Sequence, residues 1–166
     1  RVIVHVADGP CQVAGVALLA DAVEIVGNDA DPSRVVFDGQ KQYKLVGIAN
    51  DDVFIHGVTF ANGKADATSN LSGCPNWFSG CSFEMTAGTV SNGVVASGEA
   101  NYAGCLSIWG TAKVLDSEIR DGYNRDGNAN NAWRGGSLKM TGRAVVRGCR
   151  ISGGSAVRGG GVTVTT

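Results

Sequence analysis

The sequence has few of the features that define several common protein classes. It holds only three prolines, and no apolar run approaches the roughly 18 residues of a membrane span. Its 25 glycines follow no strict period of three, which excludes a collagen-like chain. The net charge of −1 argues against nucleic acid as a partner. With 166 residues, 43% of them apolar, we expect one domain over residues 1–166 with a packed core.

Helix signals are nearly absent. Only the stretch 13–23 tolerates a helix, and its Ala-Gly-Val-Ala-Leu-Leu-Ala run is equally consistent with a short capping turn or with the strand of a first coil. Residues 1–22 are therefore a possible N-terminal cap or a first coil.

The most informative feature that the sequence does contain is an internal repeat. The run Leu-Ser-Ile-Trp-Gly-Thr-Ala-Lys-Val (106–114) returns as Leu-Lys-Met-Thr-Gly-Arg-Ala-Val-Val (138–146), and the two match at every second position. The glycines of the two runs, Gly110 and Gly142, are 32 residues apart. A constant offset with a two-residue apolar rhythm predicts stacked, strand-bearing coils that bury their inner faces on one another.

The repeat also predicts which side chains stack inside. Two apolar columns are expected, Ile55/Val114/Val146 and Phe60/Ile119/Ile151. Val114 and Ile119 are an odd number of residues apart, whereas a continuous strand keeps one face at even separations. A bend must therefore fall between the columns. Glycines such as Gly57 and Gly122 end the alternating runs, and we expect them to permit positive φ at such corners.

The runs 23–27, 35–39 and 53–63 resemble the first coils of right-handed parallel β-helix proteins of the pectin-lyase-like superfamily. The Arg-Gly-Gly segments at 134–136 and 158–160 resemble the repeat regions of its secreted and surface members. The resemblance covers nearly the whole chain and implies an all-β fold, a right-handed parallel β-helix (β-solenoid) of stacked short strands. Because this architecture hosts lyases, hydrolases, adhesins and inert shafts alike, it implies no single activity.

The search for catalytic residues is mostly negative. His5 and His56 lie in alternating strands without a serine or cysteine nucleophile placed by motif, and we interpret both as wall residues. Lyase chemistry of the pectate type would need an aspartate cluster for calcium. The only adjacent pair, Asp51 and Asp52, falls in an expected turn. We therefore predict no catalytic residue, no metal site and no cofactor.

Five cysteines form an odd set with no metal-ligand spacing. Cys74 and Cys81 flank a short segment and could close a small loop by a disulfide in an oxidising compartment. Cys149 is predicted to stay a buried thiol, stacked like a small apolar residue. An extracellular or cell-surface location fits this pattern.

Charge is distributed unevenly along the chain. Residues 1–100 hold five Lys/Arg and eleven Asp/Glu, whereas residues 101–166 hold nine Lys/Arg and four Asp/Glu. The period places four arginines of the basic half on outward positions: Arg143, Arg147, Arg150 and Arg158. They form either a solvated face that keeps the stack soluble or a docking site for an anionic ligand or an acidic protein surface.

The candidate binding residues lie in excursions from the repeat. One unit carries eight more residues than the next, in the loop from Tyr123 to Trp133. The binding residues predicted there are Tyr123, Arg125, Asp126 and Trp133, and Trp77 lies in a second excursion. The alternative for Trp133 is that it covers the coil below.

These observations favour a non-enzymatic extracellular, cell-surface or assembly-forming module that binds a protein partner or a polysaccharide through lateral loops. A polysaccharide lyase or glycoside hydrolase is the first alternative, and an accessory structural subunit of a larger complex is the second. The chain runs from Arg1 to a strand-like segment ending at Thr166, so we expect a piece of a longer protein. End-to-end or capping contacts are then expected at the open coil ends.

Overall fold

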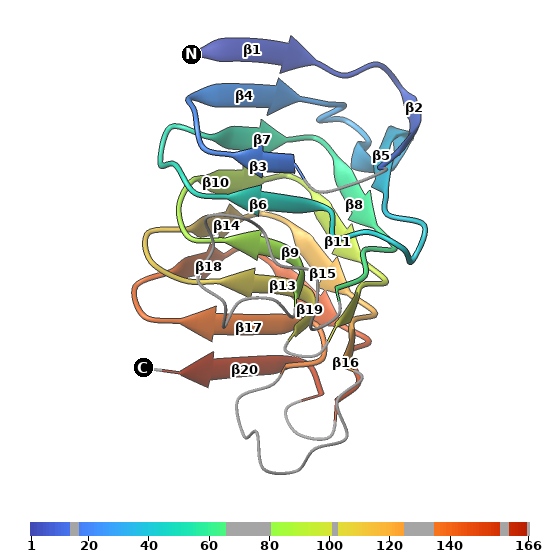
Figure 1. Ribbon diagram of the computed structural model, residues 1–166, viewed down its shortest axis with the longest axis vertical. Coiled ribbons are helices and arrows are strands. Elements are labelled where there is room, and N and C mark those ends of the chain that lie inside the picture. Colours follow the sequence, from blue (N-terminus) through green and yellow to red (C-terminus); the bar gives the residue numbers. More distant parts are fainter. Residues whose placement is uncertain (14–16, 66–80, 101–102, 125–134, 157–159, 166) are drawn as a thin grey trace.

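The computed structural model is a right-handed parallel β-helix, in which the chain passes through three stacked sheets in turn (Figure 1). It describes residues 1–13, 17–65, 81–100, 103–124, 135–156 and 160–165. Each of the three sheets, named A, B and C in chain order, has six described strands that all pair in parallel. The predicted fold class is confirmed.

Sheet A is formed by β1 (Val2–His5), β4 (Val23–Val26), β7 (Phe54–His56), β10 (Thr89–Ser91), β14 (Lys113–Leu115) and β18 (Val145–Arg147). Sheet B is formed by β2 (Gly9–Gln12), β5 (Val35–Asp38), β8 (Thr59–Ala61), β11 (Val94–Ala96), β15 (Glu118–Arg120) and β19 (Arg150–Ser152). Sheet C is formed by β3 (Ala17–Leu19), β6 (Val46–Ile48), β9 (Cys81–Met85), β13 (Ala103–Ile108), β17 (Leu138–Thr141) and β20 (Val162–Thr165). A two-stranded ladder joins β12 (Glu99–Ala100) to β16 (Tyr123–Asn124), and a 3₁₀ turn covers Pro32–Arg34.

The register confirms the predicted stacking in the second half of the chain. Val114 pairs with Val146, and Ile119 pairs with Ile151. Ile119 is fully buried, and Ile151 is half-buried because β19 is the edge strand of sheet B. The segment 13–23, which the sequence left undecided, contains the strand β3.

One coil was missing from the predicted columns. Val90 of β10 lies between Ile55 and Val114, and Val95 of β11 separates the corresponding residues of sheet B. The repeat did not reveal this coil because the number of residues that separates it from the preceding coil differs from the 32-residue offset between the two clearest copies. Ile55 and Val114 therefore share a column without being neighbours.

The predicted bend between sheets A and B is present in four successive coils. Its corner residue has a left-handed conformation in each: Gly57 (φ 66°), Asn92 (φ 45°), Asp116 (φ 47°) and Gly148 (φ 67°). Asparagine and aspartate tolerate this region better than other side-chain-bearing residues. The corner thus needs the conformation but not always a glycine.

Gly122 was predicted to permit a positive φ at a corner, and this reason for the glycine was wrong. Gly122 does not adopt a positive φ, and a Cβ placed on it would lie 2.1 Å from the carbonyl oxygen of Gly136. The glycine is required because the backbone of another coil approaches it closely. A close approach of this kind has no signature in the alternation of apolar and polar residues.

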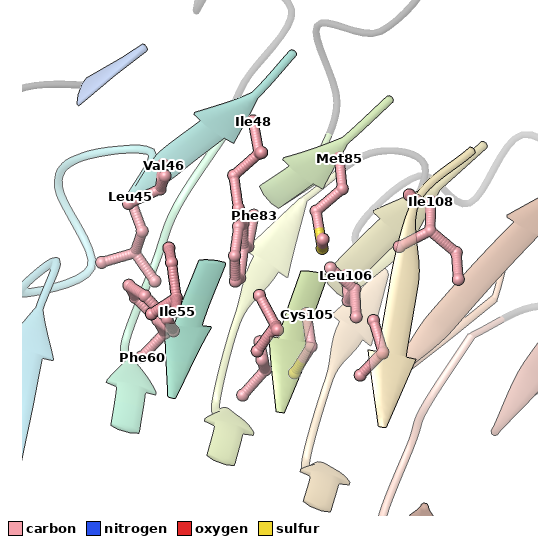
Figure 2. Packing of buried hydrophobic residues seen from close by; sticks show 14 of the residues in the cluster. Leu45, Val46, Ile48, Ile55, Phe60, Phe83, Met85, Cys105, Leu106 and Ile108 are labelled. Atoms are coloured by element: carbon pink, nitrogen blue, oxygen red, sulfur yellow. The ribbon is translucent and has the colours of Figure 1, made fainter. Parts of the chain in front are cut away.

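Large side chains fill the interior between the three sheets (Figure 2). Phe60 of sheet B lies against Phe37 on one side, with ring centroids 5.4 Å apart, and against Phe83 of sheet C on the other, at 4.6 Å. Ile55, Leu106 and Phe83 are each at most 1% exposed. This packed core leaves the outer faces of the sheets and the corners for function.

Candidate functional site on the lateral wall

A groove of about 310 Å³ runs along the outer face of sheet A, where the chain enters it from sheet C. Its floor is a column of first residues from four neighbouring strands, paired in register: Phe54, Thr89, Lys113 and Val145. Corner residues form its flank: Asp51, Gly88, Thr111 and Arg143. We call these eight residues the sheet A groove. It extends across four coils along the axis of the helix.

The charge of the sheet A groove is mainly positive. Lys113 and Arg143 are exposed, and neither forms an ion pair within the described part of the chain. Asp51, the acid among the described lining residues, accepts a hydrogen bond from Thr111 Oγ1 at 2.6 Å. Arg147 projects from the same outer face at the end of β18. The β14–β18 end of the groove can therefore attract an anion.

The other end of the groove is aromatic. Phe54 is half-buried, and the guanidinium of Arg1 lies 4.9 Å from its ring centroid. The same guanidinium forms an ion pair with Glu24 at 2.9 Å, so this arginine is neutralised locally. An aromatic floor beside hydroxyl and cationic side chains combines apolar contact with polar recognition.

A second cluster on the outer face of sheet A surrounds His56. Its Nδ1 lies 2.9 Å from the Asp29 carboxylate, and its Nε2 lies 3.5 Å from Glu24 Oε1. Asn92 donates a further hydrogen bond to Asp29. The hydrogen bond with His56 lowers the pKa of Asp29 below its ordinary value. His56 is thus a wall residue held by polar contacts, and no nucleophile is positioned on it among the described contacts.

A buried ion pair lies on the outer side of sheet C. Lys44 Nζ is 2.5 Å from Glu84 Oε2, and both side chains are 1% exposed. Burial raises the pKa of Glu84, although the charge of Lys44 offsets part of that rise. Sequence reasoning missed this pair because the two residues are far apart in the chain. The only sequence signal was the charged Glu84 between the apolar Phe83 and Met85.

Of the predicted binding residues, the structure describes Tyr123. It lies on β16 and is 51% exposed, but it does not line the sheet A groove. Four lie outside the described residues: Trp77, Arg125, Asp126 and Trp133. Of the groove residues, Arg143 was predicted to point outward as part of a solvated face or a docking site for an anionic ligand. The others were missed because the repeat identifies the inward positions of each strand and leaves most outward positions unassigned.

Among the described side chains, three cysteines are free thiols: Cys11, Cys105 and Cys149. Cys149 was predicted to be buried, but it is half-buried because it follows the edge strand β18. Its thiol lies 3.4 Å from the carbonyl oxygens of Val114 and Arg147. The predicted disulfide between Cys74 and Cys81 involves side chains that lie outside those the structure describes.

Within the described ranges, no group of three or more His, Cys, Asp or Glu side chains is placed to hold a metal ion. The described helical segment is also too short to cross a membrane. Of the predicted outward arginines, Arg143, Arg147 and Arg150 are exposed, whereas Arg158 lies outside the described residues.

The fold and its lateral groove define a parallel β-helix repeat protein. No protein-family model, curated protein or solved structure matches the chain.

Proposed function

We propose that this protein is a non-enzymatic, extracellular or cell-surface β-helix module of the pectin-lyase-like type, which binds an acidic glycan along its lateral wall. The observation that carries the proposal is the sheet A groove, where Phe54, Thr89 and Lys113 form one registered column. A ligand in this groove would lie parallel to the helix axis.

The spacing of the column supports an extended glycan. Neighbouring strands are about 4.8 Å apart, which is close to the length of one pyranose residue in an extended polysaccharide. Each coil can then contact one sugar residue. Phe54 offers an apolar surface to a sugar ring, while the hydroxyl of Thr89 can exchange hydrogen bonds with sugar hydroxyls.

The cations of the groove favour an acidic sugar over a neutral one. Lys113 and Arg143 can form charge-assisted hydrogen bonds with carboxylate or sulfate groups. Arg143 can bind such a group with two parallel hydrogen bonds, as guanidinium groups commonly do. Binding should therefore weaken as the salt concentration rises.

The test is binding to an array of neutral, carboxylated and sulfated glycans, with and without calcium. Lys113→Gln should weaken binding to acidic glycans about tenfold, the equivalent of one charge-assisted hydrogen bond. Arg150→Gln is the matched control, because this exposed arginine lies on the outer face of sheet B, away from the groove. Equal affinities for the two variants would reject the groove as the site.

A release assay on acidic polysaccharides separates this proposal from the lyase or hydrolase alternative. Unsaturated or reducing sugar ends that accumulate with time would show an enzyme. A protein that binds no glycan but co-purifies with a protein partner would favour the accessory-subunit alternative. Tyr123→Ala tests the predicted loop separately, since its exposed ring lies outside the groove.

A further inference from the structure

The Lys44–Glu84 pair joins two neighbouring coils on the outer side of sheet C. Lys44 directly precedes Leu45 and β6, and Glu84 lies in β9 opposite Gly47. The distance from Nζ to Oε2 is 2.5 Å, and each side chain is 1% exposed. An amine and a carboxyl group are thus held in contact and shielded from solvent.

The surroundings disfavour the charged form of Glu84. Removing an ammonium and a carboxylate from water costs several kcal/mol each, and their attraction repays this only when the remaining atoms are also hydrogen-bonded. Here, Glu84 Oε1 has no hydrogen-bond partner among the described residues. Burial raises the pKa of Glu84, which acts in the same direction. Transfer of one proton from Nζ to Oε2 gives a neutral amine beside a neutral acid.

We propose that Lys44 and Glu84 condense to form an intramolecular amide bond. Neutral Nζ attacks Cδ of Glu84 and forms the Nζ–Cδ bond. A second proton then passes from Nζ to Oε2, the Cδ–Oε2 bond breaks, and Oε2 leaves as water. Oε1 becomes the carbonyl oxygen of the amide. The reaction is a dehydration in which nothing is oxidised or reduced, so it needs no co-reactant.

Two features of the site promote this reaction. Contact between the groups replaces a bimolecular encounter, and well-oriented intramolecular pairs reach effective molarities of about 10⁵–10⁸ M. The positive charge of Lys139, on the outer face of β17, acts on Glu84 across the intervening Ser107. It can stabilise the negative charge that develops on Oε1 during the attack.

The bond would have a clear structural consequence. It would close a covalent loop from 44 to 84 and tie β6 to β9 in addition to their backbone hydrogen bonds. The product also replaces two buried charges by one neutral amide. A covalent tie between coils would slow their separation under heat, force or proteolysis. The proposal does not depend on the glycan-binding function.

The test is the intact mass of the purified, denatured full chain. We expect a mass lower than the sequence mass by one water molecule, and a tryptic digest in which the bond after Lys44 stays uncut. Tandem mass spectrometry should find the Lys44 peptide joined to the Glu84 peptide. These measurements use the unaltered protein, so they do not depend on whether a variant folds.

Two variants complete the experiment. Lys44→Met should restore the full sequence mass, whereas Lys41→Met, at an exposed neighbouring position, should keep the loss of water. An unaltered protein at its full sequence mass would overturn the proposal and leave a buried ion pair only. A loss of water that persists in Lys44→Met would also overturn it, because the dehydration would then lie elsewhere.

Discussion

Replacing Ile119 by alanine tests the register of the β-helix at a single position. Ile119 is fully buried in β15 and lies between Val95 and Ile151 in the inner column of sheet B. Both neighbouring strands are hydrogen-bonded to β15, so the sheet can collapse only a little around the lost atoms. The substitution therefore removes the transfer free energy of the side chain and also leaves a cavity.

The expected cost lies in the middle of the range for buried isoleucine. Ile-to-Ala substitutions in cores cost about 2–5 kcal/mol, and we expect about 3–4 kcal/mol here because the side chain is fully buried between two paired strands. In a chain of this length, this corresponds to a fall in Tm of about 10 °C. Ile119→Asp should cost still more, since it buries an unpaired charge or forces the coil open.

Urea unfolding followed by circular dichroism measures this cost. The matched control is Ile151→Ala, which removes the same atoms from the same column at the half-buried edge strand β19. The control should lose about half as much stability, in line with its smaller buried area. Equal losses in the two variants, or an unchanged melting curve for Ile119→Asp, would place Ile119 outside the interior and refute the register.

Three further predictions concern backbone contact, thiol reactivity and charge. Gly122→Ala should lower the free energy of unfolding by about 2 kcal/mol or more, as a packing defect in the core does, because its Cβ would lie 2.1 Å from Gly136 O. Thermal melting measures this loss of stability. In the folded protein, Cys105 should resist iodoacetamide at pH 8 while Cys149 reacts, because burial raises the pKa of the Cys105 thiol to about 12; equal labelling rates would contradict this. By NMR, the carboxyl of Asp29 should show a pKa below the ordinary range of an aspartate, because it accepts a hydrogen bond from His56. The stability linked to its ionisation should be present at neutral pH and lost as the pH falls through that lowered pKa.

The inner face of the protein was readable from the sequence. Apolar residues at every second position, repeated at a constant offset, predicted a parallel β-helix and the neighbours Val114/Val146 and Ile119/Ile151. This works because each coil can bury its inner face only on the coils beside it, so stacking imposes the same pattern on each unit. The bend between the columns followed from the odd spacing between Val114 and Ile119.

The outer face was decided by the tertiary structure. Lys44 meets Glu84, and His56 meets Asp29, although each pair is far apart in the chain. The corners between strands differ in length, so the offset between neighbouring coils varies along the chain, and the outward residues carry no apolar pattern that would reveal their register. The requirement for glycine at position 122 likewise arises from the approach of another coil. Local alternation therefore determines which residues point inward, whereas the path of the chain through its corners determines which outward residues meet.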